Sequence, residues 1–152
     1  MIKKALLGVA SVSVLLVAIG YVLYARNPAP TVPAVSATEA ASARKPYVVK
    51  LHAKWCPVCM LTKGVWAHID ATYSTRVNLV VFDVTNQATT DASRADAKRL
   101  GLEKFFDENA GWTGTIAVID GRTKEVTASI HGSRDFAEYR EAIDATLKGV
   151  TP

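Results

Sequence analysis

The sequence predicts an α/β fold in which a four-stranded mixed sheet is flanked by helices, in the order β-α-β-α-β-β-α. Short apolar segments alternate with segments whose apolar residues recur every three or four positions, as strands alternate with helices in such folds. A turn at 121–122 joins the last two apolar segments and predicts a hairpin. An uncharged run ahead of these elements predicts that a transmembrane helix precedes the sheet.

The first half of the predicted domain contains two strands and two helices. A first strand is predicted from Pro46 to His52, where Val and Leu dominate, and a second, largely apolar strand from Val77 to Val84. The helix between them is predicted from Val58 to Tyr73, because its apolar residues are spaced by three and four. The same reasoning places a second helix from Thr90 to Leu100.

Two residues are expected to bound this second helix, with Asp91 as its N-cap and Gly101 as its stop. The segment from Leu102 to Trp112 is less regular. We expect a short helical turn around Phe105 and Phe106, with both rings in the core, followed by a loop.

The second half of the predicted domain ends in a hairpin and a helix. The hairpin strands are predicted from Thr115 to Asp120 and from Glu125 to His131, and Ser133 is the expected cap of the last helix. The apolar face of that helix is formed by Phe136, Tyr139, Ile143 and Leu147. Because helices separate the first three strands, some of these strands should pair in parallel, with helices covering both faces of the sheet.

The chain divides into an anchor at residues 1–25, a Pro/Ala/Ser-rich linker at 26–45 and a domain at 46–152. As a helix, the uncharged run from Ala5 to Tyr24 would span roughly 30 Å, which matches the hydrocarbon core of a bilayer. Two lysines lie just before this run. The positive-inside rule therefore places the N-terminus in the cytoplasm and the domain outside.

A cleaved signal peptide is the competing interpretation of the N-terminal segment. The apolar region of a signal peptide is usually roughly 7–15 residues, shorter than this run. Small-residue cleavage sites exist only far downstream, at 35–37 and 41–43, so we favour an uncleaved anchor. The basic residues of the domain are scattered without interleaved aromatics, and we therefore expect no nucleic-acid partner.

The only two cysteines, Cys56 and Cys59, form a C-x-x-C pair between the first strand and the first helix. The dipole at a helix N-terminus favours a thiolate, and nearby Lys54, Lys50 and Lys63 would do the same. Disulfides persist outside the cytoplasm, but a bridge across so short a loop would stabilise the fold only slightly. The pair is therefore more consistent with redox chemistry than with a structural bridge.

A structural disulfide and half of a metal site remain as alternatives for this pair. Zinc requires four ligands, the chain has no second C-x-x-C, and the three histidines, His52, His68 and His131, are widely spaced. His68 is expected on the surface, and Trp66 is expected in the core. Trp112 could pack beside the pair, since it precedes Thr113.

Four segments together resemble the thioredoxin superfamily from about Tyr47 to Leu147. They are the strand followed by W-C-P-V-C, the V-V-F-D-V-T-N strand with its charged helix, the T-G-T-I-A-V-I-D-G segment, and the strand ending in His131-Gly132. With the anchor and linker, the chain is similar to membrane-tethered periplasmic thioredoxin-like proteins of bacteria. The resemblance implies a single-pass protein of the bacterial inner membrane with its C-terminal domain in the periplasm.

The resemblance also assigns roles to individual residues. Cys56 would be the exposed, attacking thiol and Cys59 the resolving thiol, and the two would alternate between a dithiol and a redox-active disulfide. Trp55 would form a wall of the site, and Pro57 and Val58, which lie between the cysteines, would shape the site around the pair. Thr113, Gly114 and Thr115 would offer backbone groups to an extended substrate, by strand addition.

Three residues depart from the family pattern. Gly114 stands where relatives carry a cis-proline that grips the partner and keeps metals away. Lys50 stands where thioredoxin has a buried carboxylate that moves protons for the resolving thiol. If Lys50 is buried its pKa should fall, and a neutral amine could act as a base. Gly64 replaces a proline that kinks the helix.

The function expected from these observations is thiol–disulfide exchange on exported proteins through Cys56 and Cys59, with a reductase slightly favoured. A membrane-bound electron donor or acceptor would be a second partner, and neither a cofactor nor a metal is expected. The alternative is a non-catalytic thioredoxin-fold module that binds a metal or docks a partner protein.

Overall fold

The computed structural model describes residue 42 and residues 44–149, so the predicted anchor and most of the predicted linker lie outside the described residues. The elements in chain order are β1 (Tyr47–His52), α3 (Pro57–Leu61), α4 (Lys63–Tyr73), β2 (Asn78–Asp83), α5 (Gln87–Leu100), α6 (Glu103–Asn109), β3 (Thr115–Ile119), β4 (Val126–His131) and α7 (Phe136–Gly149). Within this part of the chain, no helix is both long and apolar enough to cross a membrane.

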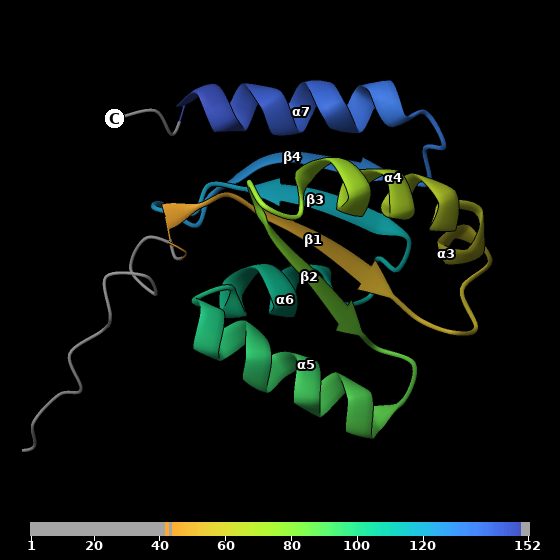
Figure 1. Cartoon of the computed structure of the whole chain (residues 1–152). Helices are drawn as coiled ribbons and strands as arrows, with labels where there is room; N and C mark the ends of the chain where they lie inside the picture. Colours follow the sequence, from red (N-terminus) through yellow and green to blue (C-terminus); the bar gives the residue numbers. More distant parts are fainter. Residues whose placement is uncertain (1–41, 43, 150–152) are drawn as a thin grey trace, which may run out of the picture. The chain divides into compact units, whose positions relative to one another are not determined.

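The four strands form one mixed sheet in the order β2-β1-β3-β4, which confirms the predicted architecture. β1 pairs in parallel with β2, whereas the β1–β3 and β3–β4 pairs are antiparallel. Helices α3, α4 and α7 cover one face of the sheet, and α5 and α6 cover the other (Figure 1). Two helical layers on a central sheet allow a domain of this size to bury apolar side chains on both faces.

Successive side chains of β1 point to opposite faces of the sheet, so the interior is divided into two cores. Val49 and Leu51 point toward α5 and α6, where they join Phe82, Phe105 and Phe106 in one buried cluster. Val48 points the other way and packs with a second cluster that includes Val65, Ile69, Tyr139 and Ile143. Phe105 and Phe106 are therefore core residues as predicted, and their segment forms the complete helix α6 rather than a single turn.

The first predicted helix is divided in two, which corrects the expectation of one helix from Val58 to Tyr73. The break lies at Thr62, which is fully buried and has φ −89° and ψ 2°. Its hydroxyl donates to the carbonyl oxygens of Val58 and Cys59 at 3.1 and 3.3 Å. Such side-chain bonds compete with the helical pattern of the backbone and favour a bend.

Two predicted helix caps are wrong. Asn86 rather than Asp91 caps α5, and its side chain accepts from the N–H of Thr89 in a reciprocal capping box. At α7 the carboxylate of Asp135 accepts a hydrogen bond from the N–H of Ala137 in the first turn. The hydroxyl of Ser133 accepts instead from the N–H of Asp135, which lies one residue before the helix begins. The stop at Gly101 is confirmed, since it ends α5 with a left-handed φ of 71°.

Candidate active site

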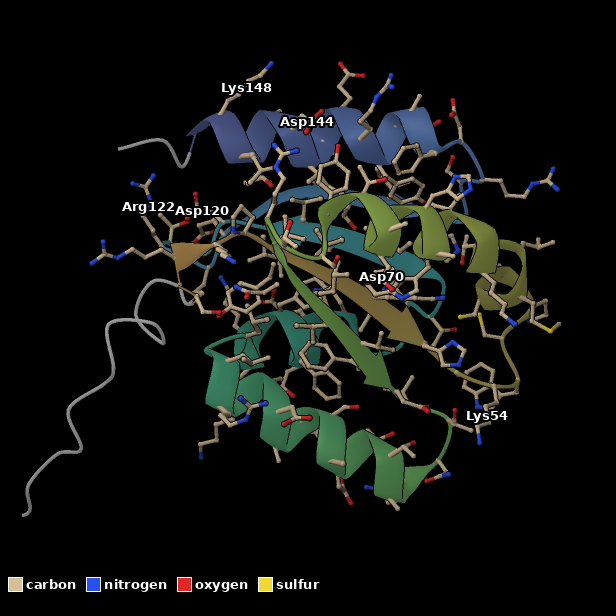
Figure 2. The ribbon with its side chains drawn as sticks, viewed as in Figure 1. Lys54, Asp70, Asp120, Arg122, Asp144 and Lys148 are labelled. Atoms are coloured by element: carbon tan, nitrogen blue, oxygen red, sulfur yellow. The ribbon has the colours of Figure 1, made fainter. Side chains whose placement is uncertain are left out.

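Cys56 is the N-cap of helix α3, at the carboxyl end of β1. Its sulfur accepts a hydrogen bond from the N–H of Cys59 at 3.1 Å, and its own N–H donates to the carbonyl of Ala53. Pro57 follows at the first helical position, where a missing N–H costs nothing. Lys54 marks this end of the sheet in Figure 2, opposite the end that carries Asp120 and Arg122.

Both cysteines are free thiols, so the structure holds the pair in its reduced state. Cys56 is 3% exposed and Cys59 is 2% exposed. The expected exposure of Cys56 is therefore wrong. Its sulfur is turned into the first turn of α3, and the pair packs with Ala53 against the half-buried Val58 and Val84.

The two thiols are perturbed in opposite directions. Burial alone would raise the pKa of Cys56, but hydrogen bonds from the Cys59 thiol, the Thr113 side chain and two backbone N–H groups outweigh it and hold the pKa below its ordinary value. Burial raises the pKa of Cys59, and so does its interaction with the Cys56 thiol. The Cys59 thiol donates to the carbonyl oxygen of Leu51 at 3.7 Å. Cys56 is thus the better thiolate, and Cys59 is the thiol that retains its proton.

The segment Thr113-Gly114-Thr115 lies against the pair, as the sequence predicted. Gly114 has φ +89°, and a Cβ atom there would lie 2.6 Å from Cγ1 of Val58. Only glycine fits both the backbone angle and the close approach. No peptide bond among residues 42 and 44–149 is cis, so Gly114 does not reproduce the cis-proline of the family.

Only part of this segment can offer backbone groups to a substrate. The N–H of Gly114 donates to the carbonyl of Leu51 at 2.8 Å, and the N–H of Thr115 donates to the carbonyl of Trp112 at 3.3 Å. Within the described part of the chain, Thr113 has no backbone partner for its N–H. Of the three N–H groups, that of Thr113 is the one left for a substrate in the described part of the chain, and the wider expectation that the segment offers backbone groups stays a prediction.

Trp55 precedes Cys56 in the chain and is 63% exposed, and its role as a wall of the site stays a prediction. Its indole Nε1 donates to the carbonyl of Thr85 at 3.0 Å, and the N–H of Lys54 donates to the hydroxyl of the same threonine at 3.0 Å. The N–H and hydroxyl of Thr85 in turn donate to Asp83. Thr85 therefore fixes the loop that carries the tryptophan.

The hydrogen bonds between Asp83 and Thr85 are not among the features predicted from the sequence. An Asp two residues before a Thr at the end of a strand is typical of a turn held by a side-chain hydrogen bond, so the pattern could have indicated them. Burial alone would raise the pKa of Asp83. The hydrogen bonds from Thr85 and the charges of His52 and Lys54 outweigh this effect and hold the pKa below its ordinary value. The carboxylate is thus held ionised beside the loop.

Lys50 is 5% exposed and lies on the central strand. Its Nζ lies 5.6 Å from the centroid of the Trp66 ring, which is half-buried against the core. Burial lowers the pKa of Lys50, as predicted, while the nearby Cys59 and Cys56 raise it and Lys63 lowers it. The structure therefore places a buried amine in the electrostatic field of both cysteines.

Several exposed side chains of α3 and of the loop before Thr113 are apolar. Met60 and Leu61 on α3 are exposed, as is Trp112 ahead of Thr113. Trp112 packs edge-on against His131, whose Nδ1 lies 3.1 Å from the hydroxyl of Thr115. His68 is on the surface as expected, edge-on to Phe136.

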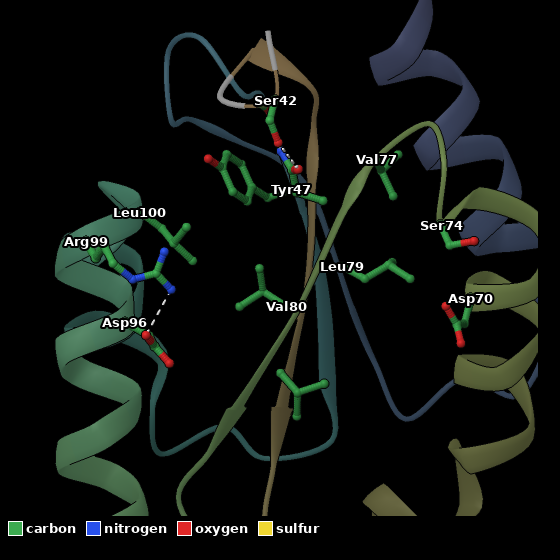
Figure 3. A pocket seen from close by; sticks show the side chains of 12 residues that line it. Ser42, Tyr47, Asp70, Ser74, Val77, Leu79, Val80, Asp96, Arg99 and Leu100 are labelled. Atoms are coloured by element: carbon green, nitrogen blue, oxygen red, sulfur yellow. Dashed lines mark hydrogen bonds and ion pairs between the residues drawn. The ribbon is translucent and has the colours of Figure 1, made fainter. Parts of the chain in front are cut away.

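The described residues contain no group of three or more His, Cys, Asp or Glu side chains that could hold a metal ion. A hollow of about 610 Å³ runs along β2 between α4 and α5 (Figure 3). It is lined by Asp70, Leu79, Val80 and Asp96 among others and by none of the predicted site residues, so it is separate from the cysteine pair.

Solved structures with similar folds were found at low sequence identity. A thiol:disulfide interchange protein from Chlorobium tepidum is 23% identical, with a TM-score of 0.47, 71% of this chain covered and 84% of that chain. Thioredoxin O2 from Arabidopsis thaliana is 20% identical, with a TM-score of 0.46 and 73% and 89% covered.

The comparison with family models is more specific. Among curated proteins, no sequence matches the chain. The family model described as thioredoxin matches residues 33–108, which is half of the chain and includes both cysteines and Lys50. The chain belongs to the thioredoxin family.

Proposed function

We propose that the protein is a thiol–disulfide oxidoreductase of exported proteins, with Cys56 as the attacking thiol and Cys59 as the resolving thiol. The observation that carries this proposal is the position of Cys56 at the N-cap of α3, where its sulfur accepts from the N–H of Cys59 at 3.1 Å and the two thiols are perturbed in opposite directions. A lowered pKa increases the fraction of Cys56 that is thiolate at a given pH, and the thiolate is the attacking species in exchange.

The reaction has two steps in the reducing direction. The Cys56 thiolate attacks one sulfur of a partner disulfide, forms a mixed disulfide and releases the other partner sulfur as a thiolate. Cys59 then loses its proton and attacks the Cys56 sulfur. This closes the Cys56–Cys59 disulfide and releases the second partner thiol, so two electrons pass to the partner. The reverse sequence oxidises a partner dithiol.

The surroundings of the pair suit a protein partner. Trp55, Met60, Leu61 and Trp112 are exposed apolar side chains on α3 and the two loops of the site. Exposed aromatic side chains are typical anchors of protein interfaces. The N–H of Thr113, beside Cys56, supplies a donor for the backbone of an extended substrate.

The setting proposed for this activity is the periplasmic side of the bacterial inner membrane. The uncharged run from Ala5 to Tyr24 and the lysines before it support a single-pass anchor with a cytoplasmic N-terminus. An anchor would raise the effective concentration of membrane-bound partners. A reductase supplied with electrons by such a partner fits this arrangement best.

Reduction of insulin by the full-length chain tests the proposed activity. We expect catalysis of insulin reduction by dithiothreitol with the wild type, and none with Cys56→Ser or Cys59→Ser. A wild type no faster than the two variants would contradict the proposal. The runner-up, a metal-binding module, would instead show metal uptake that is lost in both cysteine variants.

A further inference from the structure

Trp112 is a large apolar residue that the structure holds at the surface on a fixed backbone. It is 66% exposed. Its N–H donates to the carbonyl of Asn109 at the end of α6 at 2.8 Å, and its carbonyl accepts from the N–H of Thr115 at the start of β3 at 3.3 Å. The side chain is therefore presented to solvent at a defined place, and its own two torsions are what remain to be fixed.

His131 of β4 fixes the orientation of this side chain. The two rings meet edge to face, with centroids 6.4 Å apart and an angle of 87° between their planes. His131 is paired across the sheet with the buried Thr115, and its Nδ1 lies 3.1 Å from the hydroxyl of that threonine. A hydrogen bond at one ring nitrogen orients an imidazole, and an edge-to-face contact is a geometry that aromatic rings prefer. The buried threonine thus holds the imidazole, and the imidazole holds the indole.

Both rings belong to segments that contact the residue between the cysteines. A Cβ atom at Gly114 would lie 2.6 Å from Cγ1 of Val58, and one at Gly132 would lie 3.2 Å from the same atom. The N–H of Gly132 donates to the carbonyl of Gly114 at 3.3 Å and joins the two contacts. Trp112 precedes Gly114 by two residues, which limits the distance between their Cα atoms to about 7 Å, and His131 directly precedes Gly132. A partner chain that reaches the cysteines therefore passes close to the indole.

The same segment supplies two different kinds of contact to such a chain. Among its described residues, the backbone donor left for a substrate is the N–H of Thr113, the neighbour of Trp112. A backbone donor binds every sequence alike, whereas a neighbouring side chain discriminates between the side chains of partners. Trp112 is therefore the group of this segment that can select among partners.

We propose that Trp112 is a specificity-determining residue of the redox site and selects partner disulfides in which a bulky apolar side chain adjoins the reacting cysteine. His131 is its positioning residue. The inference rests on the proposed function and names the class of substrate within it. A ring that is already oriented loses little conformational freedom when a partner side chain packs on it, and tryptophan is a frequent anchor of interfaces.

Three peptides test this preference, each joined to glutathione through its cysteine in a mixed disulfide. Their sequences are Ser-Phe-Cys-Ala-Ser, Ser-Ala-Cys-Phe-Ser and Ser-Ala-Cys-Ala-Ser. With the full-length chain, kcat/KM for at least one phenylalanine peptide should exceed that for the alanine peptide by about tenfold. In Trp112→Ala the same ratio should fall to about one. No preference in the wild type, or the wild-type ratio in Trp112→Ala, would overturn the proposal.

Two variants of His131 separate positioning from a structural role. His131→Ala removes the edge contact and should lower the ratio to about threefold, whereas His131→Phe retains an aromatic edge and should restore it. Val126→Ala shortens an exposed apolar side chain at the start of β4 and is the matched control, for which the wild-type ratio is expected. A merely structural role would slow the reduction of all three peptides alike, so an unchanged ratio in His131→Ala would refute the positioning role.

A binding measurement tests the preference without exchange activity. In the full-length Cys56→Ser/Cys59→Ser chain, the indole N–H signal of Trp112 is followed by NMR and identified by its loss in Trp112→Phe. Titration uses the same peptides with serine in place of cysteine, and a phenylalanine peptide should shift this signal more than the alanine peptide does. No larger shift with phenylalanine would overturn the proposal. A wild type that shows this preference but reduces none of the mixed disulfides would count against the proposed function alone.

Discussion

Cys56 and Cys59 lie one helical turn apart, yet their surroundings move their pKa values in opposite directions. The C-x-x-C motif predicts that these residues react, and this much could be known from the sequence. The burial of Cys56 and the single free N–H at Thr113 could not be known from the sequence. They depend on the contact of Gly114 with Val58 and on its hydrogen bond to Leu51, and only the fold brings these residues together. Tertiary contacts, rather than the motif, therefore decide how the pair is presented.

Thr113 should control the acidity of Cys56. Its side chain hydrogen-bonds to the sulfur, which favours the thiolate, so Thr113→Val should raise the pKa of Cys56. Alkylation by iodoacetamide follows the thiolate, and its half-maximal rate should move to higher pH in the variant. Thr72→Val, which removes an exposed hydroxyl from α4, is the control and should leave the profile unchanged. An unshifted profile in Thr113→Val would exclude this hydrogen bond as a cause.

Gly114 should tolerate no side chain. Alanine at φ +89° costs about 1–2 kcal/mol in backbone energy, and its Cβ atom would overlap Val58 at a further cost of about 1–3 kcal/mol. We expect Gly114→Ala to lower the free energy of unfolding in urea by about 2–5 kcal/mol, with partial recovery when Val58→Ala is added. At Gly64 a Cβ atom would meet open space, so Gly64→Ala should raise the free energy of unfolding by about 0.5–1 kcal/mol. Equal stability of the two alanine variants would contradict the geometry at Gly114.

Most elements of the fold could be predicted from apolar periodicity, because strands and helices bury one face at different periods. The bend at Thr62 and the caps at Asn86 and Asp135 could not. These features depend on single side-chain hydrogen bonds, and a sequence offers several residues that could make each one. The structure shows which candidate has its donor within reach.

The start of α5 offers a direct test of this choice. Asn86→Ala should lower the free energy of unfolding by about 1 kcal/mol, since it removes one half of the capping box. Asp91→Ala should cost less than about 0.5 kcal/mol, because Asp91 is exposed and its partners among the described residues are Gln87 and Arg94 of its own helix. A larger loss from the Asp91 variant would mean that the cap is misassigned.

The connection between β2 and the active-site loop should be sensitive to acid. Asp83 has a lowered pKa in the folded state, so its stabilising effect is present above the unfolded pKa of about 3.9 and is lost as the pH falls through the folded value. Asp83→Asn should lower stability at pH 7 and flatten the decline in the free energy of unfolding below about pH 4. Part of the decline should remain, because Asp120 is perturbed in the same direction.

Thr85→Val provides the companion measurement. It removes a donor to Asp83, so the carboxyl pKa should rise and the acid-induced decline should begin at a higher pH than in the wild type. Identical pH profiles for the wild type and both variants would show that this hydrogen-bond network does not stabilise the loop.

At the scale of the whole molecule, the sheet holds the redox pair at one end and two separate cores on its faces. The cysteine loop is fixed from both sides: Thr85 binds Trp55 and Lys54, and Gly114 packs against Val58. Small shifts of Thr85 or of Gly114 would therefore change the environment of Cys56. The proposed anchor adds a second constraint, since it would limit the partners that this rigid site can meet.

The central claim is that Cys56 attacks a partner disulfide and that Cys59 then releases the partner. The most direct measurement is a trap in cells that express the full-length chain as Cys59→Ala or as Cys56→Ala. With Cys59→Ala, disulfide-linked complexes with exported proteins should accumulate in the membrane fraction and disappear on reduction, and none should form with Cys56→Ala. Complexes formed equally by both variants, or by neither, would contradict the account.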